Sequence, residues 1–321
     1  MNPTLSIVIP VFNEEQTLGL LGERLASMMA RASVPCEVVL IDDGSRDKSW
    51  EKMLALAAQD PRFGLVRLSR NFGHQIAITA GLDFARGEAV VVMDADLQDP
   101  PEVVLEMLAR WRAGADVVYG RRGAREGETW FKKASAAAFY RLIGSLSQVE
   151  IPVDTGDFRL MSRRAVTALQ RLGERNRFVR GMVAWLGFKQ EEVVYHRAAR
   201  AAGETKYPLS KMIRFATDGL LSFSYAPLRL ATWIGFAAAA MSLCYVLYAV
   251  LAWAVGWGVV RGWTSLVVAV LFVGGVQLLS LGIIGEYIGR IYDEVKGRPL
   301  YFTQDVREAK VPDAPLVDSR R

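Results

Sequence analysis

Asp94 and Asp96, two carboxylates separated by one residue, are the side chains of this 321-residue chain best placed to do chemistry. They follow the apolar run 90–93, which predicts a buried strand, and Gln98 lies two residues beyond them. Ligands in open α/β sheets collect at the carboxyl ends of the strands, so we expect these three side chains to face a ligand. Hard oxygen donors at this spacing suit Mg²⁺ or Mn²⁺, whose remaining ligands would be water and diphosphate oxygens. A lone D-x-D triplet is more often a solvated turn, so the metal site needs support from the rest of the chain.

Other short apolar segments also end in polar residues. Segments 5–9, 37–41 and 65–68 are rich in β-branched residues and alternate with helix-length stretches. This alternation predicts an α/β fold, with a mostly parallel sheet covered by helices on both faces. Because parallel strands end at the same edge, we expect four carboxylates to meet there, where a cation or donor groups would offset their repulsion. These carboxylates are Glu14, Asp42, Asp94 and Asp96.

Three segments of the chain resemble the sequence motifs of a known family. Residues 7–15, 41–45 and 94–98 resemble the amino-terminal signatures of family-2 inverting glycosyltransferases, which have the Rossmann-like GT-A fold. Over about residues 4–300 the chain is similar to the polyisoprenyl-phosphate glycosyltransferases. That group contains dolichyl-phosphate mannose synthase and the bacterial undecaprenyl-phosphate glucosyl and aminoarabinosyl transferases. Residues 200–207 resemble its basic R-x-x-G-x-[ST]-K segment, with Thr205 in place of the more usual Ser.

The resemblance implies a role for each motif. The metal ligands would be Asp94, Asp96 and Gln98, with Asp96 essential for catalysis. The nucleotide sugar would be bound by Pro10, Phe12, Glu14, Asp42, Asp94 and Arg122. The acceptor phosphate and leaving diphosphate would be neutralised by Arg122, Arg200 and Lys206, and the planar fork of arginine suits two phosphate oxygens. Taken singly, each basic residue is more often a solvated surface charge, and residues 42–44 are more often a turn with Gly44 at positive φ.

The acceptor side raises a question of mechanism. Asp157 takes the place of the family's acceptor-side acidic residue and is the second candidate catalytic residue. A phosphate monoester is mostly dianionic at neutral pH, so its attacking oxygen needs no base, and we expect Asp157 to orient groups rather than remove a proton. His74 and His196 form no recognisable metal or triad spacing and receive no role.

The carboxyl-terminal third has a different composition. Residues 230–260 and 262–285 contain no charged side chain, and each run exceeds the ~20 apolar residues that cross a bilayer, which predicts two transmembrane helices. Basic residues flank the pair, and Arg261 alone lies between, beside Trp253, Trp257 and Trp263. The positive-inside rule therefore places both termini and the catalytic domain on the cytoplasmic side of the inner membrane. No signal peptide is expected, and Cys36 and Cys244 are too differently placed to pair, which implies a reducing compartment.

The predicted domains follow from these shifts in composition. We expect a glycosyltransferase domain at 1–205, a juxtamembrane amphipathic helix at 206–228, a two-helix transmembrane hairpin at 229–289 and a cytoplasmic tail at 290–321. Residues 130–146 could form a second interfacial helix or pack on the sheet. The net charge of +5 fits an anionic membrane better than nucleic acid, because the basic residues concentrate beside the apolar runs.

The expected activity is inverting transfer of a hexose from a nucleotide diphosphate sugar to polyprenyl phosphate at the cytoplasmic membrane face. Residues 70–73 resemble the bacterial members, which favours a UDP-sugar, glucose and undecaprenyl phosphate, with GDP-mannose as the second choice. A homo-oligomer is compatible with this function. A non-catalytic, nucleotide-sensing component of a lipid-sugar transport system is the alternative from another class. A processive synthase would carry Q-x-x-R-W, and a dinucleotide dehydrogenase G-x-G-x-x-G after the first strand; neither motif is found.

Overall fold

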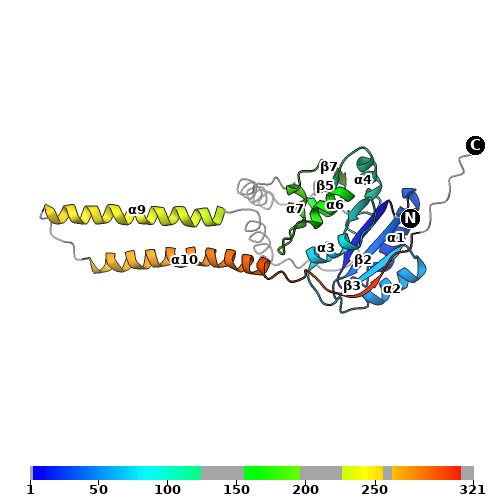
Figure 1. Cartoon of the computed structure of the whole chain (residues 1–321), viewed down its shortest axis with the longest axis horizontal. Coiled ribbons are helices and arrows are strands. Elements are labelled where there is room, and N and C mark those ends of the chain that lie inside the picture. Colours follow the sequence, from blue (N-terminus) through cyan, green and yellow to red (C-terminus); the bar gives the residue numbers. More distant parts are fainter. Residues whose placement is uncertain (1–2, 124–154, 196–225, 256–261, 312–321) are drawn as a thin grey trace, which may run out of the picture. The chain divides into compact units, whose positions relative to one another are not determined.

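The computed structural model describes residues 3–123, 155–195, 226–255 and 262–311 (Figure 1). The chain divides into two compact units. The first contains the described residues up to 195 together with those from 298 onward, and the second contains the helices between them. The expected helix at 130–146, and residues 206–225 of the helix expected at 206–228, lie outside the described residues.

An eight-stranded sheet forms the centre of the first unit, in the order β7-β5-β6-β4-β1-β2-β3-β8. Its strands are β1 Leu5–Val11, β2 Cys36–Asp42, β3 Phe63–Leu68, β4 Ala89–Val92, β5 Val117–Arg122, β6 Thr155–Ser162, β7 Gln190–Tyr195 and β8 Thr303–Arg307. The four strands β4, β1, β2 and β3 are mutually parallel, as is the pair β5 and β7. Strand β6 is antiparallel to both of its neighbours, and β8 is antiparallel to β3. The predicted α/β class is confirmed, and the sheet is mixed.

Helices cover both faces of this sheet. They are α1 Leu18–Ala32, α2 Ser49–Gln59, α3 His74–Phe84, α4 Val103–Arg112, α6 Arg163–Gln170 and α7 Val179–Trp185. Alternate residues of β1, such as Ile7 and Ile9, join the core cluster that includes residues of α1 and α4. Val8, which points to the opposite face, lies against Gly81 of α3. Every residue of β1 is therefore buried, as expected for a parallel strand between two layers of helices.

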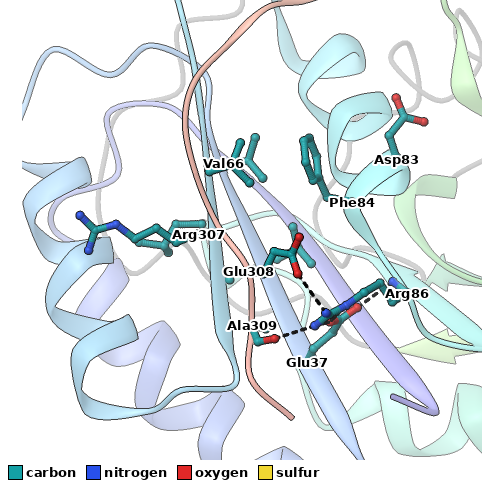
Figure 2. Close-up of a pocket in the computed structure, with 12 residues that line it drawn as sticks. Glu37, Val66, Asp83, Phe84, Arg86, Arg307, Glu308 and Ala309 are labelled. Carbon is teal, nitrogen blue, oxygen red and sulfur yellow. Dashed lines mark hydrogen bonds and ion pairs between the residues drawn. The ribbon is translucent and has the colours of Figure 1, made fainter. Parts of the chain in front are cut away.

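The last strand, β8, pairs with the edge of β3 after more than two hundred intervening residues. The Arg86 guanidinium holds the segment that follows β8. It donates to the carbonyl oxygen of Ala309 and to the carboxylate of Glu37, a residue that is 1% exposed. Figure 2 shows Arg86 between these groups and Glu308, beside a cavity formed by β2, β3, α3 and β8. This cavity lies near the amino ends of β2 and β3, whereas Asp94 follows the carboxyl end of β4.

The second unit contains two long helices, α9 Ala226–Ala254 and α10 Trp263–Val295, which contact each other. Among the described residues, one stretch is long and apolar enough to cross a membrane, Phe272–Val295 in α10. Helix α9 carries a shorter apolar stretch, Ala231–Tyr245. The two expected helices are thus present, while their crossing of a membrane stays a prediction.

Candidate active site

The carboxyl ends of β1, β2 and β4 lie at one edge of the sheet, because these strands are parallel neighbours. After β2, the chain makes the turn expected for Asp42-Asp43-Gly44. The Asp42 Oδ1 atom accepts the Ser45 N–H at 2.9 Å, and Gly44 has a φ of +70°. A Cβ atom on Gly44 would come within 2.6 Å of the Arg70 backbone, so glycine allows the loops after β2 and β3 to meet.

Asp43 joins this turn to the start of α3. Its carboxylate accepts the backbone N–H groups of Phe72 at 2.7 Å and Gly73 at 3.0 Å. Gly73, at φ +99°, then turns the chain so that His74 begins the helix. Burial raises the pKa of Asp43, although the two N–H groups oppose this effect. Asp43 therefore places His74 at the carboxyl edge of the sheet.

The predicted metal ligands occupy the loop after β4. Asp96 Oδ1 accepts the Gln98 N–H at 3.1 Å, and Leu97 between them has a φ of +59°, a strained conformation for a branched residue. The Asp94 Oδ1 atom is buried without a hydrogen-bond partner among the described residues. Burial, together with the charges of nearby aspartates, raises the pKa of Asp94 to about 6. A cation bound here would offset the repulsion between these carboxylates.

The donor set fits a hard divalent ion that also takes ligands from a substrate. Within the described part of the chain, no three His, Cys, Asp or Glu side chains gather closely enough to hold a metal alone. Asp94, Asp96 and Gln98 supply two carboxylates and an amide, which leaves coordination positions for diphosphate oxygens and water. The aspartates whose negative charges raise the pKa of Asp94 are Asp157, Asp99 and Asp96.

His74, which received no role from the sequence, lies between two of these carboxylates. Its Nε2 atom is 3.5 Å from Asp94 Oδ1 and 3.3 Å from Asp157 Oδ2. Burial opposes its charge, but the hydrogen bond to Asp157 and the charge of Asp94 outweigh burial and raise the pKa of His74. The usable sequence signal was Gly73 in the loop after the third strand, since it ends the loop at the edge that carries the other site residues.

Asp157 is almost fully buried and is held by several donors. Arg180 donates to it through Nε at 2.8 Å and Nη2 at 3.2 Å, and Gln75 through Nε2 at 3.1 Å. Although burial alone would raise it, His74 and Arg180 hold the pKa of Asp157 well below its usual range. The group is therefore a permanent carboxylate at neutral pH and a weak base. Arg180 carried no recognisable sequence signal.

The expected nucleoside-binding residues have partners of their own. Asp42 is fully buried, and its Oδ2 atom lies 3.2 Å from Arg67 Nε, whose guanidinium also lies over the Trp50 ring at 5.1 Å. Glu14 Oε2 accepts the Thr17 hydroxyl at 3.0 Å near the start of α1. Pro10 lies within buried β1, whereas Phe12 is 44% exposed just beyond it.

The basic residues can be placed only in part. Arg122 is the last residue of β5 and pairs with Tyr195 of β7. Its side chain is not among those that the structure describes. Tyr195 itself donates a hydrogen bond to Asp99 and packs edge-on against Phe158, which ties β7 to the loop of Asp96. Arg200 and Lys206 lie outside the described residues.

A mixed α/β sheet with a D-x-D loop after its fourth strand defines the class of GT-A-like glycosyltransferases. Residues 6–169 match "Glycosyl transferase family 2", and residues 226–291 match "GtrB C-terminal hairpin". The chain belongs to glycosyltransferase family 2, as its sequence signatures predicted.

Several relatives are similar over nearly their full length. The chain is 50% identical to "Uncharacterized glycosyltransferase YkcC" of Bacillus subtilis (strain 168), covering 93% of each chain. It is 42% identical to "Bactoprenol glucosyl transferase" of Shigella phage SfII, covering 92% of this chain and 96% of the relative. It is 40% identical to "Prophage bactoprenol glucosyl transferase homolog" of Escherichia coli (strain K12), covering 95% and 99%.

A more distant likeness is found among solved structures. Glucosyl-3-phosphoglycerate synthase of Mycobacterium tuberculosis, in complex with Mn²⁺, UDP-glucose and phosphoglyceric acid, is 21% identical with a TM-score of 0.47. The match covers 68% of this chain and 79% of that one.

Proposed function

We propose that this glycosyltransferase moves glucose from UDP-glucose to a polyprenyl phosphate, with inversion, at the cytoplasmic face of the inner membrane. One observation carries the proposal: the chain is 40–42% identical, over at least nine tenths of its length, to proteins named bactoprenol glucosyl transferase. The matched carboxyl-terminal hairpin family and the exposed apolar side chains of α9 and α10, such as Leu278 and Trp233, support attachment to a membrane.

The donor half of the site would use the edge formed by β1, β2 and β4. Asp94, Asp96 and Gln98 would hold Mg²⁺ or Mn²⁺, which supplies charge stabilisation to the leaving diphosphate when bound. The base and ribose would be enclosed by Pro10, Phe12, Glu14 and Asp42, with Arg122 near the phosphates. The negative charges of Asp157, Asp99 and Asp96 around Asp94, which a cation would offset, support the metal assignment.

The acceptor half would use Asp157 and the basic residues. The phosphate monoester attacks as a dianion, so no side chain has to remove a proton. Asp157 would orient Arg180 and the acceptor, and the strong donors around its carboxylate support this role over that of a base. Arg122, Arg200 and Lys206 would neutralise the phosphates at the membrane boundary.

The membrane arrangement completes the proposal. Two spans within 229–289, a catalytic domain at 1–205 and an amphipathic helix at 206–228 would place both termini in the cytoplasm. Residues 290–321 would return to the cytoplasmic side, and the pairing of β8 with β3 supports this placement.

The test uses the purified full-length chain in lipid nanodiscs with undecaprenyl phosphate and Mg²⁺ or Mn²⁺. Labelled UDP-glucose, UDP-N-acetylglucosamine and GDP-mannose are supplied separately, and lipid-linked label is extracted into organic solvent. We expect product from UDP-glucose only when both lipid phosphate and metal are present. Product from GDP-mannose alone would support the mannosyltransferase alternative. Nucleotide binding without any product would favour the non-catalytic alternative.

A further inference from the structure

His74 has one hydrogen-bond donor that lies near two carboxylates, one in the loop after β4 and one in β6. The Nε2 atom faces Asp94 Oδ1, beyond the end of β4, and Asp157 Oδ2, in β6, at 3.5 and 3.3 Å. A ring nitrogen carries a single proton, so it can make a full hydrogen bond to only one of the two carboxylates at a time. A shift of a few tenths of an ångström in either direction decides which one receives it.

The two carboxylates differ in the number of other hydrogen bonds that they accept. Asp157 already accepts three hydrogen bonds from Arg180 and Gln75. The facing oxygen of Asp94 is buried and has no hydrogen-bond partner among the described residues. The loss of His74 would therefore leave Asp157 held but deprive Asp94 of the donor nearest to its Oδ1 atom.

The backbone that carries His74 is fixed from both sides. Asp43 holds the two N–H groups immediately before it. Gln75, immediately after it, bonds Asp157 and accepts the Val179 N–H at 2.9 Å, which joins the first turn of α3 to α7. The imidazole itself is 46% exposed, so it faces the solvent side of the site rather than filling the core.

We propose that His74 is a positioning residue: it holds Asp94 Oδ1 so that the other carboxylate oxygen is presented to the cation and its bound diphosphate, and it ties this donor side to the Asp157 network. This inference rests on the proposed function, because it assigns Asp94 to a metal–nucleotide complex. It goes beyond that function in naming the group that orients the metal ligand.

The experiment compares His74→Leu, which removes the donor, with His74→Gln, whose amide nitrogen restores a donor at similar reach. The affinity of the full-length protein for UDP is measured by calorimetry, with and without Mn²⁺, and bound Mn²⁺ is counted by electron paramagnetic resonance. Arg110→Leu, which breaks the ion pairs of Arg110 with Glu106 and Glu191, sets the baseline for an unrelated surface change.

We expect His74→Leu to weaken UDP binding about tenfold in the presence of Mn²⁺, the usual loss for one hydrogen bond to a charged group, and to leave metal-free binding unchanged. His74→Gln should recover most of the loss. The KM for polyprenyl phosphate should change less than about twofold, because Asp157 keeps its other donors.

Three results would overturn the inference: equal losses with and without metal, a glutamine variant as weak as the leucine variant, or a change confined to the acceptor KM. If the wild-type chain shows no metal-dependent nucleotide binding at all, the proposed function fails and this inference fails with it. If wild-type binding is metal-dependent but no sugar is transferred, only the proposed reaction fails, and the comparison of the His74 variants still decides the role of His74.

Discussion

Asp157 shows how neighbouring donors limit what a side chain can do. The sequence could mark it only through the family pattern, because its partners His74 and Arg180 are separated from it by long stretches of chain. The loop of Asp94, Asp96 and Gln98 was predictable, since its donors are close in sequence and follow an apolar run. Contacts within one loop can be inferred from spacing, whereas contacts between loops depend on how the strands pair.

The first prediction concerns Asp157→Asn. The wild-type carboxylate, whose pKa lies below its ordinary value near 3.9, stays ionised as the pH rises, so its charge is constant from about pH 7 to 9. We expect the variant to transfer sugar more slowly, because Arg180 and Gln75 lose an acceptor, while both pH–rate profiles stay flat over that range. A wild-type rate that rises with pH through an ionisation absent from the variant would identify Asp157 as a base.

The second prediction concerns Asp96→Asn. The change removes one negative charge from a partly exposed loop and leaves the packing of β4 intact. We expect transfer to fall at least about a hundredfold, while the melting temperature and membrane association stay at wild-type values. Activity is measured at saturating Mn²⁺, and near wild-type turnover there would exclude Asp96 as a metal ligand.

The strands and helices of the first unit were the most predictable elements. Runs rich in β-branched residues identified β1, β2, β3 and β4, because both faces of a parallel strand are buried and most of its length is apolar. β8 gave no such signal, since Thr303–Arg307 is polar and mostly exposed at the sheet edge. Its place depends on a partner strand far away in the chain.

The third prediction compares two glycines in helices. A Cβ on Gly81 of α3 would clash with Val8 and would lie 2.6 Å from Ile41 Cδ1, whereas a Cβ on Gly19 of α1 would meet nothing within 4 Å. Gly81→Ala should destabilise the protein by about 1–3 kcal/mol through overpacking, despite the better helix propensity of alanine. Gly19→Ala should stabilise it by up to about 1 kcal/mol. Both changes are measured by chemical unfolding, and a stabilising Gly81→Ala would mean that the sheet can yield beneath α3.

At the scale of the whole molecule, composition predicted the division into a charged part and an apolar part, but it could not settle the number of spans. The apolar stretch of α9 is shorter than that of α10. The basic residues indicated a membrane surface because they lie beside the apolar runs. The magnitude of the net charge did not by itself indicate one.

The fourth prediction concerns Arg200 and Lys206, which the sequence places just before the juxtamembrane segment. Replacing either residue with Ala should raise the KM for polyprenyl phosphate about tenfold and change UDP affinity much less, because the lost contact is to a phosphate held at the membrane. Steady-state kinetics with varied lipid, alongside calorimetry with UDP, separate these effects. A collapse of UDP affinity with normal use of the lipid would move both residues to the donor side.

The pairing of β8 with β3 has a consequence for biosynthesis. A ribosome makes α9 and α10 before it makes Thr303–Arg307, so the sheet lacks β8 until both helices have been synthesised. During that interval the edge of β3 is open to pairing with other chains, and Arg86 lacks its contact to Ala309. A nascent chain that stalls after α10 would therefore expose an unpaired strand edge.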